Sequence, residues 1–316
     1  MVNPYAMYVR LARSAKVAAT GAALIATLSC TSPPEGPRQQ TFAAPEDAVK
    51  TLAESVKKES LPDVIAIFGP EGQDLIDSSD PASARRSRQV FTIAMAEGWR
   101  LVDDGANRKS LVLGHEEWPF PVPLVKDGDA WRFDTASGKE EVLARRIGRN
   151  ELDVIRACRT YVVAQRVYAK RGHDGKPAGL YAQKFRSDPG QHNGLYWPAG
   201  RGEKLSPLGD RVGTAEGTVT AAAGQGPSPF HGYFFKILTA QGPGAPGGQK
   251  NYLEKGEMSG GFALVAWPAT YDATGIMTFL VSHEGVVYEK DLGAETATVA
   301  KAITVFEPDS TWKAVQ

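Results

Sequence analysis

The spacing of apolar residues predicts helices first and strands afterwards. In "APEDAVKTLAESVKKES", apolar side chains recur at i, i+3, i+4 and i+7, which indicates a helix with one apolar face: Val49, Leu52, Ala53 and Val56. "LPDVIAIFG" predicts a short second helix, and residues 82–98 a third. The stretches "WRLVDDGANRKSLVLG" and "WPFPVPLVKDGDAWRFD" then each predict strand, turn and strand. Helices followed by a curved antiparallel sheet indicate a small α+β unit.

Three alternating prolines stand in the second of these strand regions. Pro119, Pro121 and Pro123 all lack a backbone N–H, and the alternation turns the three gaps to one side of an extended chain. Because an edge strand tolerates missing donors on its outer side, an edge strand is predicted here.

A second unit is predicted to begin within "RRIGRNELDVIRACRTYVVAQRVYA". Gly148 suits the end of one segment and Asn150 the N-cap of a helix. From there one apolar stripe runs for about five turns, formed by Val154, Ile155, Cys158, Tyr161, Val162, Gln165 and Tyr168. Four strands of an antiparallel meander follow at 232–238, 261–267, 275–281 and 286–291, and then a helix at 294–303. The predicted fold is therefore α+β with two units, residues 44–146 and 147–316.

Segment 239–260, "TAQGPGAPGGQKNYLEKGEMSG", is predicted to be a long loop. Loops of this length inside a compact domain usually have a function or lack a fixed structure.

The formal net charge argues against two classes of function, binding of nucleic acid and binding of an anionic membrane. The 316 residues contain 36 Lys and Arg and 36 Asp and Glu, so the formal net charge is zero. Without residues 1–29, which hold three basic and no acidic residues, the net charge is near −3. The overall charge thus gives no basis for binding nucleic acid or an anionic membrane surface.

Residues 1–29 have the pattern of an export signal. Arg10, Arg13 and Lys16 precede the apolar run "VAATGAALIATLS", which is too short for a transmembrane helix. Cys30 follows at once, and the site resembles the lipobox of bacterial lipoproteins, although Thr27 and Leu28 depart from the usual residues. We expect a signal peptide over 1–29, lipid on Cys30 and a polar, Pro-rich tether over 30–43. The expected location is the periplasmic side of the envelope, at the outer membrane; the alternative is a soluble periplasmic protein.

Several motifs together identify a family. "FAAPEDAV", "WPFPVPLVKDGDAWRFDTASGKEE", "RRIGRNELDVIRACRTYVVAQRVYA", "HGYFFKILTAQGPGAPGG" and "GGFALVAWPATY" resemble the bacterial domain-of-unknown-function 2950 family. The resemblance implies an exported protein and supplies no catalytic residues. The order of elements also resembles two folds, the nuclear-transport-factor-two-like cone in the first unit and the globular domain of type IV pilin-like proteins in the second. Since "GKEEVLARRIGR" is too charged to insert in a membrane, the second likeness implies a pilin-like fold without fibre assembly.

Candidate chemistry is sparse. Cys158 lies on the apolar stripe and is expected to be a core residue rather than a nucleophile. The five histidines show no helical pairing, so neither a metal site nor a cofactor is expected. One possible pocket, suited to a small molecule or to a hydrolase- or isomerase-like reaction, is formed in the first unit by His115, Glu116, Trp118 and Trp131.

Aromatic residues of the second unit give the leading hypothesis. "GYFFKI" is aromatic on both strand faces, so one face is free to meet the other unit, the 239–260 loop or a partner. Tyr233, Phe235 and Tyr252 are the candidate binding surface. We therefore expect a non-catalytic binding or assembly module whose partner is an unknown envelope protein, with membrane contact only through the lipid anchor and no nucleic acid.

Overall fold

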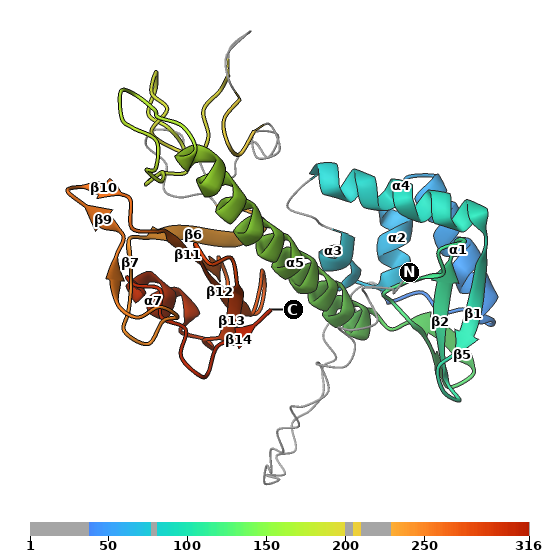
Figure 1. The fold of residues 1–316 in the computed structure, drawn as a ribbon. Helices are drawn as coiled ribbons and strands as arrows, with labels where there is room; N and C mark the ends of the chain where they lie inside the picture. The colour runs from blue at the N-terminus through green and yellow to red at the C-terminus, as the bar shows by residue number, and fades with distance from the viewer. Residues whose placement is uncertain (1–37, 77–80, 200–204, 210–228, 316) are drawn as a thin grey trace, which may run out of the picture. The chain divides into compact units, whose positions relative to one another are not determined.

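The computed structural model describes residues 38–76, 81–199, 205–209 and 229–315 (Figure 1). The predicted signal peptide, Cys30 and most of the tether lie outside these ranges. The chain divides into two compact units, residues 1–145 and 146–316. Helices lead and antiparallel sheets follow, which confirms the α+β class. Within the described ranges, no helix has the length and apolar character needed to cross a bilayer.

The N-terminal unit packs helices against an antiparallel sheet. The helices are α1 (Pro45–Lys57), α2 (Leu61–Phe68), α3 (Gly72–Ile76) and α4 (Pro81–Glu97). The strands are β1 (Trp99–Asp103), β2 (Arg108–Leu113), β3 (Trp118–Pro119), β4 (Leu124–Asp127) and β5 (Ala130–Phe133). The sheet order is β1-β2-β4-β5, with β3 also paired to β2. Val49 and Leu52 of α1 are buried in the core with Leu111 and Phe133 of the sheet.

The predicted edge strand is confirmed only for the short strand β3, which pairs with β2 alone, and not for the rest of the proline segment. Pro119 ends β3, Pro121 and Pro123 lie outside the strands, and β4 is an inner strand between β2 and β5. Without N–H groups the prolines cannot continue the ladder, and they divide the predicted strand in two.

The folded unit begins before residue 44. Phe42, assigned above to the tether, is buried and exchanges two backbone hydrogen bonds with Trp131 at 2.8 and 2.7 Å. The side-chain amide of Gln39 donates to the carbonyls of Ile67 (3.0 Å) and Phe133 (2.7 Å). Residues 39–42 therefore belong to the N-terminal unit.

A single helix, α5 (Thr135–Ala169), runs through the division between the units. A break at Gly148 and a cap at Asn150 are therefore wrong predictions. Asp134 caps the helix instead, because its carboxylate accepts bonds from the backbone N–H (3.4 Å) and the hydroxyl (2.6 Å) of Ser137. Asn150 lies inside the helix and donates its side-chain amide to the carbonyl of Thr274 at 2.8 Å.

The C-terminal unit places the second half of α5 on a five-stranded antiparallel sheet. The order is β14-β13-β12-β11-β6. Its strands are β6 (Tyr233–Leu238), β11 (Ala263–Pro268), β12 (Met277–Ser282), β13 (Val287–Asp291) and β14 (Lys313–Ala314), and α7 is Thr296–Ala302. Every residue of β11 is buried, so both faces of the sheet are covered. All seven residues of the predicted α5 stripe are buried, which confirms that face of the helix.

The 239–260 segment is ordered by two small hairpins. They pair β7 (Ala240–Gln241) with β8 (Lys250–Asn251), and β9 (Leu253–Glu254) with β10 (Glu257–Met258). The buried side chain of Gln241 holds the segment together, donating to the carbonyls of Pro246 and Gly248 and accepting from the hydroxyl of Tyr252 at 2.6 Å.

A buried carboxylate fixes α5 to the start of β12. Glu151 is 7% exposed, and its Oε1 atom accepts the backbone N–H groups of Ile276 and Met277, both at 2.9 Å. The Tyr233 hydroxyl lies 3.5 Å from the same oxygen and donates to the carbonyl of Met277 at 3.0 Å. The charge is thus compensated by donors, as a buried carboxylate requires.

Candidate binding pocket

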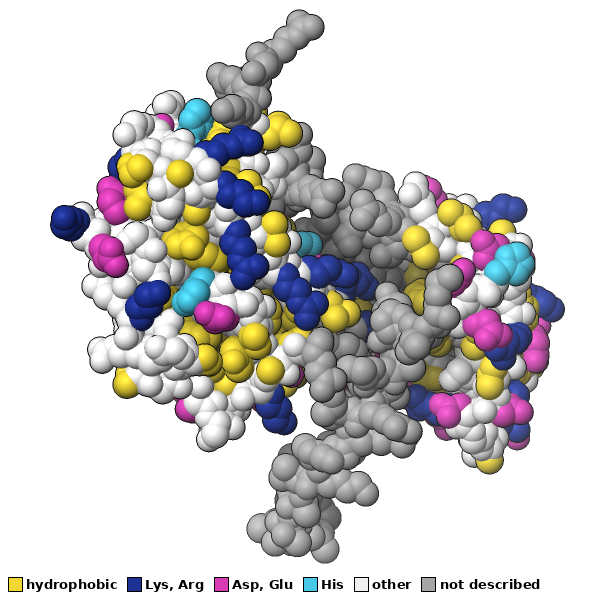
Figure 2. All heavy atoms as spheres, viewed as in Figure 1, with side chains coloured by type: hydrophobic (Ala, Val, Ile, Leu, Met, Phe, Trp, Pro, Cys, Tyr) yellow, Lys and Arg dark blue, Asp and Glu magenta, His cyan; other side chains and the backbone are white. Residues whose placement is uncertain are grey.

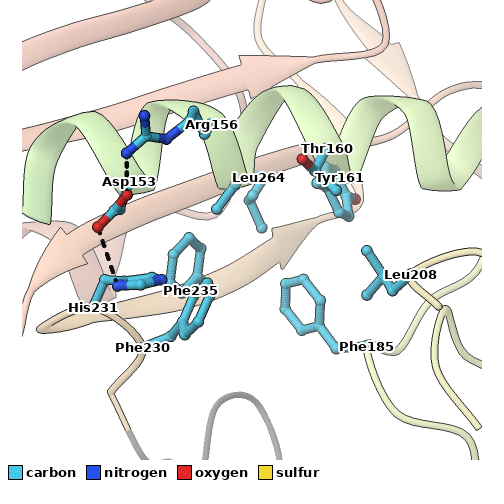
Figure 3. A pocket seen from close by; sticks show the side chains of 11 residues that line it. Asp153, Arg156, Thr160, Tyr161, Phe185, Leu208, Phe230, His231, Phe235 and Leu264 are labelled. Atoms are coloured by element: carbon cyan, nitrogen blue, oxygen red, sulfur yellow. Dashed lines mark hydrogen bonds and ion pairs between the residues drawn. The ribbon is translucent and has the colours of Figure 1, made fainter. Parts of the chain in front are cut away.

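A pocket of about 230 Å³ lies in the C-terminal unit, beside α5 (Figure 3). We call it the α5–β6 pocket. Its lining comes from α5, from β6 and the turn before it, from β11, and from the connection between α5 and β6. The residues are Asp153, Arg156, Ala157, Thr160, Tyr161, Phe185, Leu208, Phe230, His231, Phe235 and Leu264.

Aromatic rings form most of the apolar wall. The ring centroids of Phe230 and Phe235 are 6.1 Å apart, and those of Tyr161 and Phe185 are 5.9 Å apart. Phe185, Phe230 and Phe235 are only partly buried, so their rings keep exposed surface at the pocket. Such rings supply large apolar area for a ligand at little conformational cost.

Charged groups lie together at one end of the pocket (Figure 3). Asp153 of α5 forms an ion pair with Arg156 on the next turn of the helix. The second oxygen of Asp153 lies 3.3 Å from Nδ1 of His231. Asp153 is 21% exposed, His231 41% and Arg156 67%, so the carboxylate is the inner member of the group and the two basic side chains are the outer ones.

The backbone before β6 places His231 at this position. His231 has φ 46° and Gly232 φ 74°, two successive left-handed residues that turn the chain between Phe230 and Tyr233. A Cβ at Gly232 would lie 2.8 Å from Cβ of Thr274, so glycine is required there. The imidazole packs on the ring of Phe230, with centroids 4.0 Å apart.

Tyr161 closes the pocket on the core side. Its hydroxyl donates to the carbonyl of Ala263 (3.2 Å) and accepts from the side-chain amide of Gln165 (3.1 Å). Burial raises the pKa of Tyr161 well above its ordinary value. The phenol therefore stays neutral and serves as a wall.

The four residues predicted to form a pocket in the N-terminal unit do not line a common pocket wall: two are exposed and two pack in or against the core. The His115 side chain is 82% exposed and its Nδ1 lies 3.7 Å from the Glu97 carboxylate, while Glu116 is exposed in the same turn. Trp131 is buried in the core, and Trp118 packs against that core with its ring centroid 6.2 Å from Phe120. The tryptophans thus stabilise the fold, and the two polar residues face solvent.

The predicted aromatic surface is only partly present. Tyr233 and Tyr252 are fully buried, because both faces of the sheet are covered and Tyr252 is held by Gln241. Placing these two tyrosines on a binding surface is therefore wrong. Phe235 remains and lines the α5–β6 pocket. Asp153 and Arg156 were not predicted as site residues, and His231 is one of the five histidines for which no helical pairing was found. The local signal was "FHGYFF", a histidine and glycine between aromatic residues.

Cys158 is fully buried on the core face of α5, and burial raises its pKa to about 12. Among the residues that the structure describes, no group of three or more His, Cys, Asp and Glu could hold a metal ion.

The described residues thus form an α+β protein of two units, in which an aromatic pocket lies beside the long helix α5. The family model "Protein of unknown function (DUF2950)" matches residues 39–315, so the chain belongs to this family. No curated protein and no solved structure gives a significant match. The likenesses to the nuclear-transport-factor-two-like and pilin-like folds stay predictions.

Proposed function

We propose that this protein is a non-catalytic binding module of the bacterial cell envelope, and that the α5–β6 pocket receives an apolar side chain of a partner protein. The observation that carries the proposal is an apolar, aromatic pocket with a charged rim. Protein interfaces concentrate their binding energy in such pockets, where one anchor residue is desolvated inside a polar ring.

The size of the pocket favours a side chain over a small-molecule ligand. Small-molecule sites commonly enclose roughly 300–1,000 Å³. At about 230 Å³, the α5–β6 pocket is smaller than this range. An aromatic or large aliphatic side chain fits this space and would pack on Phe230 and Phe235.

One observation favours an enzyme as the second candidate. The contact of Asp153 with Nδ1 of His231 is the arrangement that orients a histidine as a general base. A nucleophilic enzyme also needs a hydroxyl or thiol within hydrogen-bond reach of the histidine. Within the described ranges, His231 has no hydrogen bond to a Ser, Thr or Cys, and Thr160 lies at the other end of the pocket (Figure 3). We therefore rank binding first.

The proposal also includes a cellular location. We infer export by residues 1–29 and lipid on Cys30, with the protein held at the periplasmic face of the outer membrane. The C-terminal unit, a long helix on an antiparallel meander, supports the proposed pilin-like fold. Detergent phase partitioning tests the anchor: the wild type should enter the detergent phase and Cys30→Ser the aqueous phase. Equal partitioning would refute lipidation and leave the soluble periplasmic alternative.

Site-specific photo-crosslinking in bacterial cells tests the binding site. A photoreactive amino acid at Thr160, on the exposed rim, should give a discrete adduct with an envelope protein. The same photoreactive amino acid in place of Val299, which is 42% exposed on α7, is the positional control. Phe235→Ala should abolish the adduct at Thr160. Phe234→Ala should preserve it, because Phe234 packs on Trp267 and does not line the pocket.

The other outcomes decide between the candidates. An adduct that forms equally at Val299, or that survives Phe235→Ala, contradicts the proposed site. Native mass spectrometry of the purified protein supplies the second measurement. A small molecule bound to the wild type and lost from Phe235→Ala, with no protein adduct, would favour the ligand-binding or enzyme alternative.

A further inference from the structure

We infer that the partner segment that fills the α5–β6 pocket is acidic: a peptide whose aromatic or large aliphatic anchor is flanked by Asp and Glu. This inference rests on the proposed function and adds the chemistry of the partner. It is drawn from the charges around the pocket, which are independent of the aromatic lining.

Positive charge is concentrated on the second half of α5 and the two residues that follow it. Residues 146–171 hold seven Lys and Arg and two acids, in a chain whose formal net charge is zero. All seven are exposed: Arg146, Arg149, Arg156, Arg159, Arg166, Lys170 and Arg171. Figure 2 shows Lys and Arg gathered over α5. We call these seven residues the basic face.

The acids of this stretch do not neutralise the basic face. Glu151 is buried and bound by the N–H groups of Ile276 and Met277. Asp153 is shared between Arg156 and His231. Within residues 146–171 the seven cations therefore outnumber the two acids.

The basic face reaches the pocket at Arg156, and two further arginines lie close to it along α5. Arg156 is itself part of the lining. Arg149 lies four residues before Asp153, hence one turn along the same side of the helix. Arg159 follows Arg156 by three residues, again one turn on. A segment with its anchor in the pocket would thus pass cations on α5 within one or two turns.

Charge complementarity selects an acidic segment. A basic partner would meet like charges at the rim, which costs affinity, whereas Asp and Glu are attracted and steered to the site. An anionic membrane could also meet the basic face, where Val163 and Val167 are 58% and 43% exposed. A bilayer surface, however, has no single projecting side chain to fill a pocket of about 230 Å³. The pocket and the cations together therefore favour a peptide.

Selection from a random peptide library tests the inference. The target is purified chain without residues 1–37, immobilised at low salt, and bound peptides are read by sequencing. We expect enrichment of Asp and Glu around one Trp, Phe, Tyr or Leu. Affinities of the selected peptides are then measured by fluorescence anisotropy, and they should fall steeply as salt screens the rim charges.

Two variants with the same change in net charge separate a local effect from a general one. Arg149→Glu/Arg156→Glu should weaken the selected peptides roughly tenfold or more. Lys50→Glu/Lys58→Glu reverses two exposed charges, one in α1 and one directly after it, outside the pocket, and should leave the affinity unchanged within about twofold. Circular dichroism checks that both variants are folded.

Each outcome is decisive. Selected peptides without acidic enrichment that bind equally to Arg149→Glu/Arg156→Glu, yet are lost with Phe235→Ala, overturn the acidic partner and leave the proposed function standing. Acidic peptides that survive Phe235→Ala, or anionic vesicles (phosphatidylglycerol) that bind in their place, show that the basic face acts without the pocket and overturn the inference. Failure to select any peptide that depends on Phe235 overturns the proposed function itself.

Discussion

Nδ1 of His231 lies 3.3 Å from a carboxylate oxygen of Asp153, and the two residues come from distant parts of the chain. Asp153 also pairs with Arg156, so one acid restrains the two basic side chains of the pocket rim. The same acid lowers the positive charge that an incoming partner would meet.

Asp153→Asn is expected to strengthen binding of a selected acidic peptide by roughly fivefold, since a partly exposed charge pair is worth about 1 kcal/mol or less. Anisotropy titration measures the change, with Asp129→Asn in the β4–β5 turn as the exposed control. Stability should change by no more than about 1 kcal/mol for the same reason. Weaker binding would show that Asp153 contacts the partner or holds the rim in its binding form.

The local pattern of apolar and polar residues is sufficient to predict most of the fold. The apolar stripe on α5 and the four strands of the meander follow from periodicity, because a buried helix face and buried strands leave regular spacings. The start of α5 was missed because Gly148 and Asn150 carry boundary signals that the surrounding helix overrides. Burial of Glu151 and the bond of Asn150 to Thr274 depend on contacts more than 120 residues distant.

The site could not be predicted in the same way. The pocket brings together residues from distant segments beside α5, among them Phe185, Phe230 and Leu264. They come together only after the sheet has formed, so no local spacing in the sequence predicts their contact. Alternation assigned Tyr233 and Phe235 correctly to one strand, but it could not show which strand faces would be covered. The "FHGYFF" turn was visible in the sequence, yet its meaning depends on Asp153, which lies on another element.

Glu151→Ala should lower the free energy of unfolding of the C-terminal unit by about 3 kcal/mol. Two backbone N–H groups lose a charged acceptor, and bonds to charged groups are worth roughly 1.5–3 kcal/mol. Glu151→Gln keeps an acceptor oxygen and should cost less. Urea unfolding measures both, and Glu254→Ala, at an exposed acid, should stay within about 0.5 kcal/mol. Equal losses for Gln and Ala would mean that the carboxylate charge is the whole effect.

Glu289 should make stability depend on pH. Burial, together with the nearby Glu151, raises the pKa of Glu289 in the folded protein, and Lys313 opposes the shift. A carboxyl with a raised folded-state pKa favours folding most when protonated, and this contribution is lost as pH rises from the unfolded value, about 4.3, through the folded value. Glu289→Gln should therefore be more stable than the wild type at pH 7.

The pH profile provides the check on Glu289. The advantage of Glu289→Gln should shrink as pH falls towards 4, since the wild-type carboxyl then becomes neutral too. Thermal unfolding at pH 4, 5, 6 and 7 measures the difference. Glu254→Gln, at an exposed site, should give a much flatter difference. If Glu289→Gln is less stable at pH 7, attraction to Lys313 outweighs the burial of the charge.

Cys158 should be inert in the native protein. Only the thiolate reacts with alkylating agents, and with a pKa raised to about 12 by burial, the thiolate fraction at pH 8 is roughly one part in ten thousand. The packing of α5 on the sheet also keeps the alkylating reagent away from the buried thiol. Cys30→Ser leaves Cys158 as the single cysteine, and mass spectrometry should detect alkylation in urea but not in buffer. Cys30→Ser/Cys158→Ala/Val163→Cys places one thiol at a position that is 58% exposed and should react at once. If Cys158 is labelled as fast as this control, the packing of α5 on the sheet opens readily, and the stripe that includes Tyr161 cannot serve as a fixed wall of the pocket.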